Sequence, residues 1–175
     1  LFVFLDASDL AVSCAIYLRT ITDDRSVVVA VVLGASHVLP RNTTFRGTLS
    51  IPRAELCAAT LLAKKTQEVE MDLVKKGKGM LSERTQYFTD SQDVLAWLRN
   101  DKDPQKKYVA NRVNEILTRT RLSDWYHIPT LHNPADVGTR PISVAKLKQS
   151  AWLKGPEFLT QEPAVLPLSL IHISE

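Results

Sequence analysis

Residues 1–38, LFVFLDASDLAVSCAIYLRTITDDRSVVVAVVLGASHV, decide the fold, because they hold three apolar, β-branched runs separated by short polar breaks. The runs cover Phe2 to Leu5, Val12 to Thr20 and Ser26 to Val38, with turns such as Asp23-Asp24 between them. Runs of this length and composition predict β-strands. Short connections join antiparallel neighbours, so we expect the chain to begin with a three-stranded antiparallel meander.

The composition changes at Ile51, where helix formers follow and Pro52 occupies the first turn, so we expect a long helix to about Val69. Beyond the Gly77 to Gly79 break, strands and helices alternate. The expected elements are a strand at Thr85 to Thr89, a helix opened by Ser91 and running through Leu98, a helix at Tyr108 to Thr118, a strand at Trp125 to Ile128, and a turn at Asn133-Pro134 that enters a helix. The order βββαβααβα predicts an α/β domain with a mixed five-stranded sheet flanked by helices.

The length of 175 residues suits one domain, which we place at residues 1–150. Residues 151–167 are rich in proline and predict a linker toward a further domain. Residues 168–175 resemble translated sequencing adapter, and we expect a non-native tail there. The chain opens on Leu1 and not on methionine, which suggests a piece of a longer protein.

The composition is that of a folded globular chain, with 45% hydrophobic and 23% charged residues, and it excludes a disordered chain. The longest apolar run, Val27 to Leu33, is far shorter than the ~20 residues that a membrane helix needs, so we expect no membrane partner. Cys14 and Cys57 fit neither a disulfide framework nor a zinc cluster. We therefore expect reduced core cysteines in an intracellular protein.

The net charge of +3 is too small to identify a partner, but the basic residues are clustered. Clusters of this kind suit either a solvated helix face or contacts to phosphates. They lie at Lys64-Lys65, at Lys75 to Lys78, and from Lys102 through Lys106-Lys107 and Arg112 to Arg121.

Four carboxylates stand where elements end or pack: Asp6, Glu55, Asp90 and Asp136. Each one also suits an ordinary turn, cap or first-turn position. Asp6 and Glu55, however, have apolar neighbours, and a buried charge that lacks a partner costs several kcal/mol. If the first and fourth strands are parallel neighbours, Asp6 and Asp90 meet at the sheet edge where α/β folds place ligands. Magnesium prefers carboxylate oxygens, so these residues predict a metal cluster and phosphoryl chemistry.

Six short motifs occur in one order along the chain and carry a family resemblance. They are Leu5-Asp6-Ala7-Ser8, Ile51-Pro52-Arg53-Ala54-Glu55-Leu56, Phe88-Thr89-Asp90-Ser91, Tyr108-Val109-Ala110-Asn111-Arg112-Val113, Asn133-Pro134-Ala135-Asp136 and Trp152-Leu153-Lys154-Gly155-Pro156-Glu157-Phe158-Leu159. Together they resemble the ribonuclease H region of Bel/Pao-type LTR retrotransposon polyproteins, over about Leu1 to Leu159. Each motif is weak alone, and the ordered set is specific.

The resemblance implies a ribonuclease H-like fold and a two-metal endonuclease that cleaves the RNA strand of RNA–DNA hybrids during reverse transcription. It implies two Mg²⁺ ions, with Mn²⁺ as an alternative, and the reverse transcriptase and integrase regions of the same polyprotein as partners in cytoplasmic virus-like particles. The family is often labelled a Pao retrotransposon peptidase. Asp6-Ala7-Ser8 is not the Asp-Ser/Thr-Gly turn of an aspartic protease, so we do not expect protease chemistry.

The resemblance matches Asp6, Glu55, Asp90 and Asp136 to the family's metal-binding, catalytic carboxylates. We expect one ion on Asp6 and Asp90 and a second shared with Glu55 and Asp136, with Asp6 bridging the two. Hybrid selection is expected from contacts to 2′-hydroxyls, and affinity from basic side chains on phosphates. The basic residues expected to bind nucleic acid are Lys106, Lys107 and Arg112.

Two alternatives and one departure remain at this point. A non-catalytic connection module that grips template–primer is the main alternative, although a decayed domain has no reason to keep all four acids. An integrase or transposase is disfavoured because those cores usually place their glutamate last.

Many ribonucleases H carry a loop histidine well before the last aspartate, whereas His132 lies four positions before Asp136. We expect His127 in the core or at the sheet edge.

Overall fold

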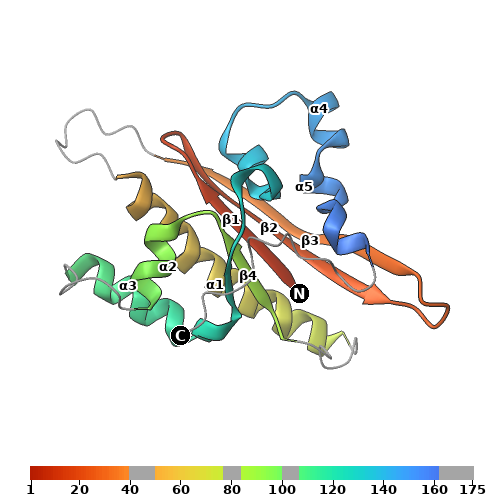
Figure 1. Ribbon diagram of the computed structural model, residues 1–175, viewed down its shortest axis with the longest axis horizontal. Helices are drawn as coiled ribbons and strands as arrows, with labels where there is room; N and C mark the ends of the chain where they lie inside the picture. Colours follow the sequence, from red (N-terminus) through yellow and green to blue (C-terminus); the bar gives the residue numbers. More distant parts are fainter. Residues whose placement is uncertain (40–49, 77–83, 100–106, 162–175) are drawn as a thin grey trace.

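The computed structural model describes residues 1–39, 50–76, 84–99 and 107–161, and its centre is a mixed five-stranded sheet (Figure 1). The strand order is β3-β2-β1-β4-β5. Strands β1, β2 and β3 are antiparallel neighbours, whereas β4 runs parallel to both β1 and β5. The strands are β1 (Phe2–Ala7), β2 (Ala11–Ile21), β3 (Val27–Val38), β4 (Gln86–Thr89) and β5 (Trp125–His127). The predicted fold class, including the antiparallel opening, is confirmed.

Helices cover both faces of this sheet (Figure 1). One face carries α1 (Ile51–Lys75), α2 (Gln92–Leu98) and α3 (Lys107–Leu117). On the other side lie α4 (Val144–Gln149), α5 (Ala151–Lys154) and the 3₁₀ turns η3 (Pro134–Thr139) and η4 (Glu157–Thr160), while η1 (Leu122–Asp124) and η2 (Thr130–His132) flank β5. Helix α1 runs beyond the expected end at Val69, because the next residues, EMDLVK, still favour helix. The helix expected after Asn133-Pro134 is the short 3₁₀ turn η3.

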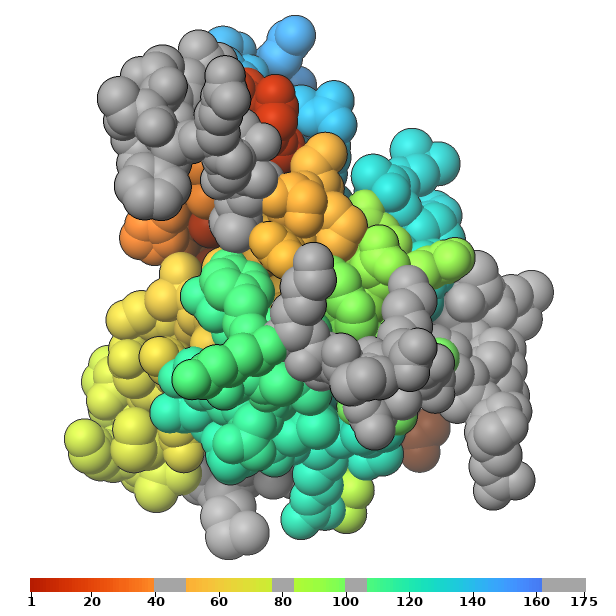
Figure 2. Space-filling model, turned by 90° about the vertical axis from the view of Figure 1, so that its left-hand side faces the viewer, coloured from red at the N-terminus to blue at the C-terminus, as the bar shows by residue number. Residues whose placement is uncertain are grey.

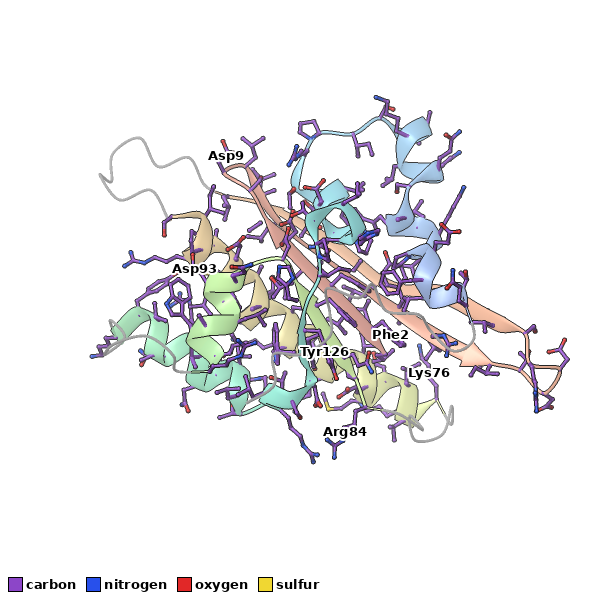
Figure 3. The ribbon with its side chains drawn as sticks, viewed as in Figure 1. Phe2, Asp9, Lys76, Arg84, Asp93 and Tyr126 are labelled. Atoms are coloured by element: carbon purple, nitrogen blue, oxygen red, sulfur yellow. The ribbon has the colours of Figure 1, made fainter. Side chains whose placement is uncertain are left out.

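Strand β1 is buried along its whole length because both of its faces are covered. Successive side chains of a strand point to opposite faces. Val3 and Leu5 therefore pack toward α1, in a core with Leu56 and Leu62. Figure 3 shows side chains filling the space between the sheet and the helices, with the exposed Asp9 at the periphery.

The opposite face of the sheet is aromatic. Phe4 stacks on Phe88 with ring centroids 4.8 Å apart, and it meets Phe158 of η4 edge-on at 6.2 Å. Leu159 is fully buried in the same cluster. The segment that follows residue 150 thus supplies part of this second core.

Hydrogen bonds also fasten this carboxy-terminal segment to the sheet. The Tyr17 hydroxyl lies 3.0 Å from the Ala151 carbonyl oxygen and 2.9 Å from that of Trp152. The Arg19 guanidinium donates to the Leu159 carbonyl oxygen at 2.9 Å. Residues of the stretch from 151 to 161 therefore pack against the sheet, and apolar side chains are interspersed among its glycine and proline. The rest of the expected linker and the expected tail, residues 162–175, lie outside the described residues.

Two expectations drawn from composition can be compared with the described part of the chain. Within it, Cys14 is buried and Cys57 half-buried, and neither forms a disulfide. Among the helices described, none is both long and apolar enough to cross a membrane.

Candidate metal centre

Three of the predicted carboxylates meet at one end of the sheet. Leu5 of β1 pairs in parallel register with Thr89 of β4. Asp6 and Asp90 directly follow these residues, so the register carries both acids to the same edge. Glu55 reaches the same point from the second turn of α1. One oxygen from each of Asp6, Glu55 and Asp90 lies within 4.8 Å of the other two.

The three acids crowd negative charge into a partly desolvated place. Burial and, after it, the negative charge of Asp90 raise the pKa of Asp6 to about 6. Burial likewise raises the pKa of Glu55 to about 7, against the lowering effect of a hydrogen bond from Ser91. A divalent cation would relieve this repulsion. Because clustered carboxylate oxygens are the ligands that Mg²⁺ and Mn²⁺ prefer, the residues present fit such an ion.

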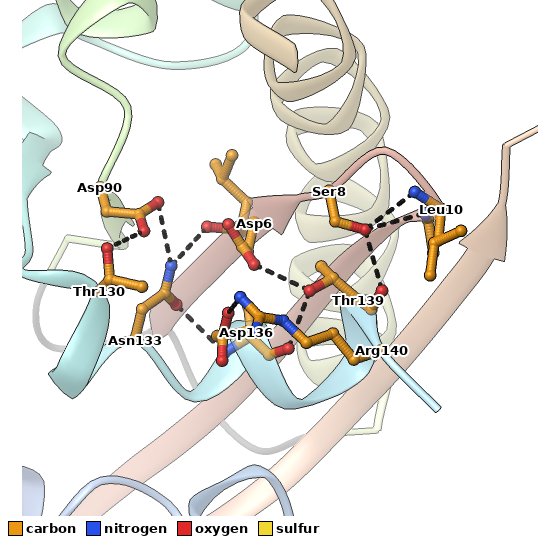
Figure 4. Close-up of polar contacts among 12 residues, drawn as sticks. Asp6, Ser8, Leu10, Asp90, Thr130, Asn133, Asp136, Thr139 and Arg140 are labelled. Atoms are coloured by element: carbon orange, nitrogen blue, oxygen red, sulfur yellow. Dashed lines mark hydrogen bonds and ion pairs between the residues drawn. The ribbon is translucent and has the colours of Figure 1, made fainter. Parts of the chain in front are cut away.

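Hydroxyl groups hold the three carboxylates in place. Ser91 donates to Glu55 Oε2 at 2.5 Å, and its Oγ also accepts the Val94 amide at the start of α2. Thr130 donates to Asp90 Oδ2 at 2.6 Å, and Thr139 donates to Asp6 Oδ2 at 3.2 Å (Figure 4). Sequence reasoning identified Ser91 as the opening of a helix, without its link to Glu55. It missed both threonines, since each one contacts a carboxylate at least 40 positions away in the chain.

Asp136, the fourth predicted acid, stands beside this cluster and not within it. Its Oδ1 pairs with the Arg140 guanidinium at 3.2 Å (Figure 4). Its charge nevertheless contributes to the raised pKa of Asp6, which places it within electrostatic reach. The structure thus brings three of the four acids together and leaves the fourth alongside them.

The cluster opens into a groove of about 820 Å³, lined by Glu55, Asp90, Ser91, residues of α2, and His127. His127 lies on the edge strand β5, as expected, and it also forms part of this wall. Figure 2 shows the face on which the amino-terminal end of α1, α2 and the segment near residue 130 come together.

Two of the basic residues expected to bind nucleic acid, Lys107 and Arg112, occupy the neighbouring helix, α3. Lys107 is exposed at its start, and the Arg112 guanidinium lies 3.5 Å from the centroid of the Tyr108 ring. Arg53 of α1, which was not predicted, approaches the same ring at 5.4 Å. In the described part of the chain, neither arginine has a carboxylate within ion-pair distance. Lys106 lies outside the described residues.

A mixed sheet in the order β3-β2-β1-β4-β5, with acids converging at the shared end of β1 and β4, defines a ribonuclease H-like domain. Over residues 1–91 the chain matches the family described as Pao retrotransposon-like RNaseH-like domain, and it belongs to that family. The expected resemblance is confirmed. The matched stretch includes Asp6, Glu55 and Asp90.

Two solved structures resemble the chain. One is RNase H1 from the halophilic archaeon Halobacterium salinarum NRC-1, at 17% identity and a TM-score of 0.45, covering 78% of this chain and 90% of that one. The other is the N-terminal RNase H domain of a Mycobacterium tuberculosis protein, solved as a fusion with maltose binding protein, at 14% identity and a TM-score of 0.45, covering 78% and 93%. No curated protein matches the chain.

Proposed function

We propose that this domain is a metal-dependent endoribonuclease that cleaves the RNA strand of RNA–DNA hybrids during reverse transcription of a retrotransposon. Family membership supports a retrotransposon ribonuclease H-like role. The observation that carries the proposal is the convergence of the Asp6, Glu55 and Asp90 oxygens within 4.8 Å at the mouth of an open groove.

In this proposal Asp6, Glu55 and Asp90 would hold divalent ions, and Asp136 would contribute from beside the cluster. Mg²⁺ is the expected ion and Mn²⁺ the alternative. Bound ions of this kind activate a water and stabilise the leaving oxygen of a phosphodiester. The Ser91 and Thr139 hydroxyls, which donate to Glu55 and Asp6, would keep these two carboxylates oriented.

The substrate would lie across the groove toward α3. Lys107 and Arg112 supply positive charge for phosphates there. Discrimination against DNA duplexes would come from contacts to 2′-hydroxyls across a shallow minor groove. The proposed partners are the reverse transcriptase and integrase regions of the same polyprotein, within cytoplasmic virus-like particles.

Incubation of the 175-residue chain with labelled RNA–DNA hybrid, in Mg²⁺ and in chelator, tests the proposal. We expect Mg²⁺-dependent loss of the RNA strand of the hybrid, with duplex RNA and duplex DNA left intact. Asp90→Asn should abolish cleavage and spare hybrid binding. Cleavage that persists in this variant would contradict the metal assignment, and hybrid binding without cleavage by the wild type would favour the connection module.

A further inference from the structure

We propose that Thr130 and Asn133 are positioning residues that fix the Asp90 carboxylate for its cation, an inference that rests on the metal centre proposed above. The two residues bracket a short turn at the carboxy-terminal end of β5. Thr130 Oγ1 donates to Asp90 Oδ2 at 2.6 Å, and Asn133 Nδ2 lies 3.5 Å from Asp90 Oδ1 (Figure 4). Each oxygen of one carboxylate therefore faces a different donor of the same turn.

Asn133 also links this carboxylate to the rest of the site. Its amide nitrogen donates to the Leu5 carbonyl oxygen at 2.9 Å, on the residue that precedes Asp6. Its amide oxygen accepts the Ala135 backbone N–H at 3.1 Å and so caps η3, the turn that carries Asp136. One side chain thus joins the strand of Asp6, the carboxylate of Asp90 and the turn of Asp136.

The amide of Asn133 is chemically suited to this place. The residue is only 4% exposed, and its two N–H groups and its oxygen each have an acceptor or a donor within reach. An amide adds no charge to the crowded acids, whereas a carboxylate at the same position would add repulsion. A carboxylate offers about four lone-pair directions, so the two donors leave Asp90 able to bind a cation.

The simpler reading is that Asn133 serves only as the cap of η3. Asn133→Ser separates the two readings, because a serine hydroxyl can still accept the Ala135 N–H but is too short to reach the Leu5 oxygen and Asp90. Thr130→Val removes the other donor at an exposed position, where the risk of unfolding is small. The matched control is Ser143→Ala, which removes the hydroxyl that caps α4 without touching a carboxylate.

The experiment measures Mn²⁺ binding to the 175-residue chain by titration calorimetry, with thermal unfolding in chelator as the check on folding. We expect Asn133→Ser to weaken Mn²⁺ binding by about tenfold or more, as loss of an outer-shell partner does. Thr130→Val should weaken it by a smaller, measurable factor, and Ser143→Ala should leave it unchanged.

Folded Asn133→Ser protein that binds Mn²⁺ as tightly as the wild type would overturn the role of Asn133. Should that variant unfold in chelator, wild-type affinity in Thr130→Val would overturn the proposal in its place. Asp90→Asn is the reference for the centre itself. A wild-type chain that binds no Mn²⁺, or binds it as Asp90→Asn does, would refute the proposed metal centre and the positioning role together, an outcome distinct from the first two.

Discussion

Replacement of Gly138 by alanine should open the carboxy-terminal segment from the sheet. A Cβ atom on Gly138 would lie 1.8 Å from Trp152 Cζ3 and 2.2 Å from Ser13 Oγ, far inside the ~3.5 Å at which non-bonded carbon atoms rest. Gly34 limits a shift of the indole toward β3, because a Cβ atom on Gly34 would lie 2.3 Å from the ring's Nε1. Among the described glycines, Gly155 alone has a positive φ. The backbone at Gly138 would therefore accept alanine without strain. The Trp152 ring must therefore leave the space between Gly34 and Gly138.

The expected cost of Gly138→Ala is about 2–3 kcal/mol, the upper part of the range for overpacked cores. For a domain of this size, that loss lowers Tm by roughly 5–10 °C. Urea unfolding followed by circular dichroism measures the change in the free energy of unfolding. The same substitution is also measured in a Trp152→Ala variant, in which the space between Gly34 and Gly138 is empty. The other contact of the new Cβ atom, the Ser13 hydroxyl, can rotate away.

In the Trp152→Ala background, Gly138→Ala should cost less than about 0.5 kcal/mol, which makes the two substitutions strongly non-additive. Equal costs in both backgrounds, or a cost below about 0.5 kcal/mol in the wild type, would refute the tight packing of the Trp152 ring against Gly34 and Gly138.

The pKa of Asp6 is raised from 3.8 to about 6, and that of Glu55 from 4.5 to about 7. Between about pH 4 and pH 7 the metal-free folded state therefore binds more protons than the unfolded state. Its free energy of unfolding should therefore fall as the pH rises from about 4 to 7, and urea titrations in chelator should show this slope flattened in the Asp6→Asn, Glu55→Gln double variant. Arg112→Ala should weaken hybrid binding and reduce the slope of log affinity against log salt by about one, whereas Asn114→Ala, exposed on the same helix, should change neither. Arg25 has φ 63° in the β2–β3 turn, so Arg25→Gly should stabilise the protein by about 0.5–1 kcal/mol in the same urea assay, and a loss of stability would contradict this.

Much of the fold, and the carboxylates that form the site, can be predicted from local features of the sequence. The β-branched runs before residue 39 predict the meander, because strands and the short turns between them differ in composition. The meeting of Asp6 with Asp90 follows from one topological assumption, that the first and fourth strands are parallel neighbours, and the structure confirms that assumption. Glu55 joins them because its helix crosses the same end of the sheet.

The remainder depends on contacts between distant residues, which leave no local pattern. Trp152 fits between Gly34 and Gly138, and nothing near any of the three residues marks the slot. Thr130 and Asn133 occupy a turn whose sequence suggests only a helix entry, although their side chains reach Asp90. The position of Asp136 beside Arg140 likewise depends on the exact path of a 3₁₀ turn.

The carboxy-terminal cover of the sheet has a consequence for biosynthesis. The hydrogen bond between Tyr17 and the Trp152 carbonyl joins residues 135 positions apart, and Phe4 meets Phe158 across a similar separation. At translation rates of about 5–20 residues per second, the aromatic face of β1 leaves the ribosome roughly 8–30 s before the segment that covers it. During that interval the nascent chain exposes an apolar surface of the kind that chaperones bind. The folding yield should therefore depend on the supply of chaperones, although the domain is small.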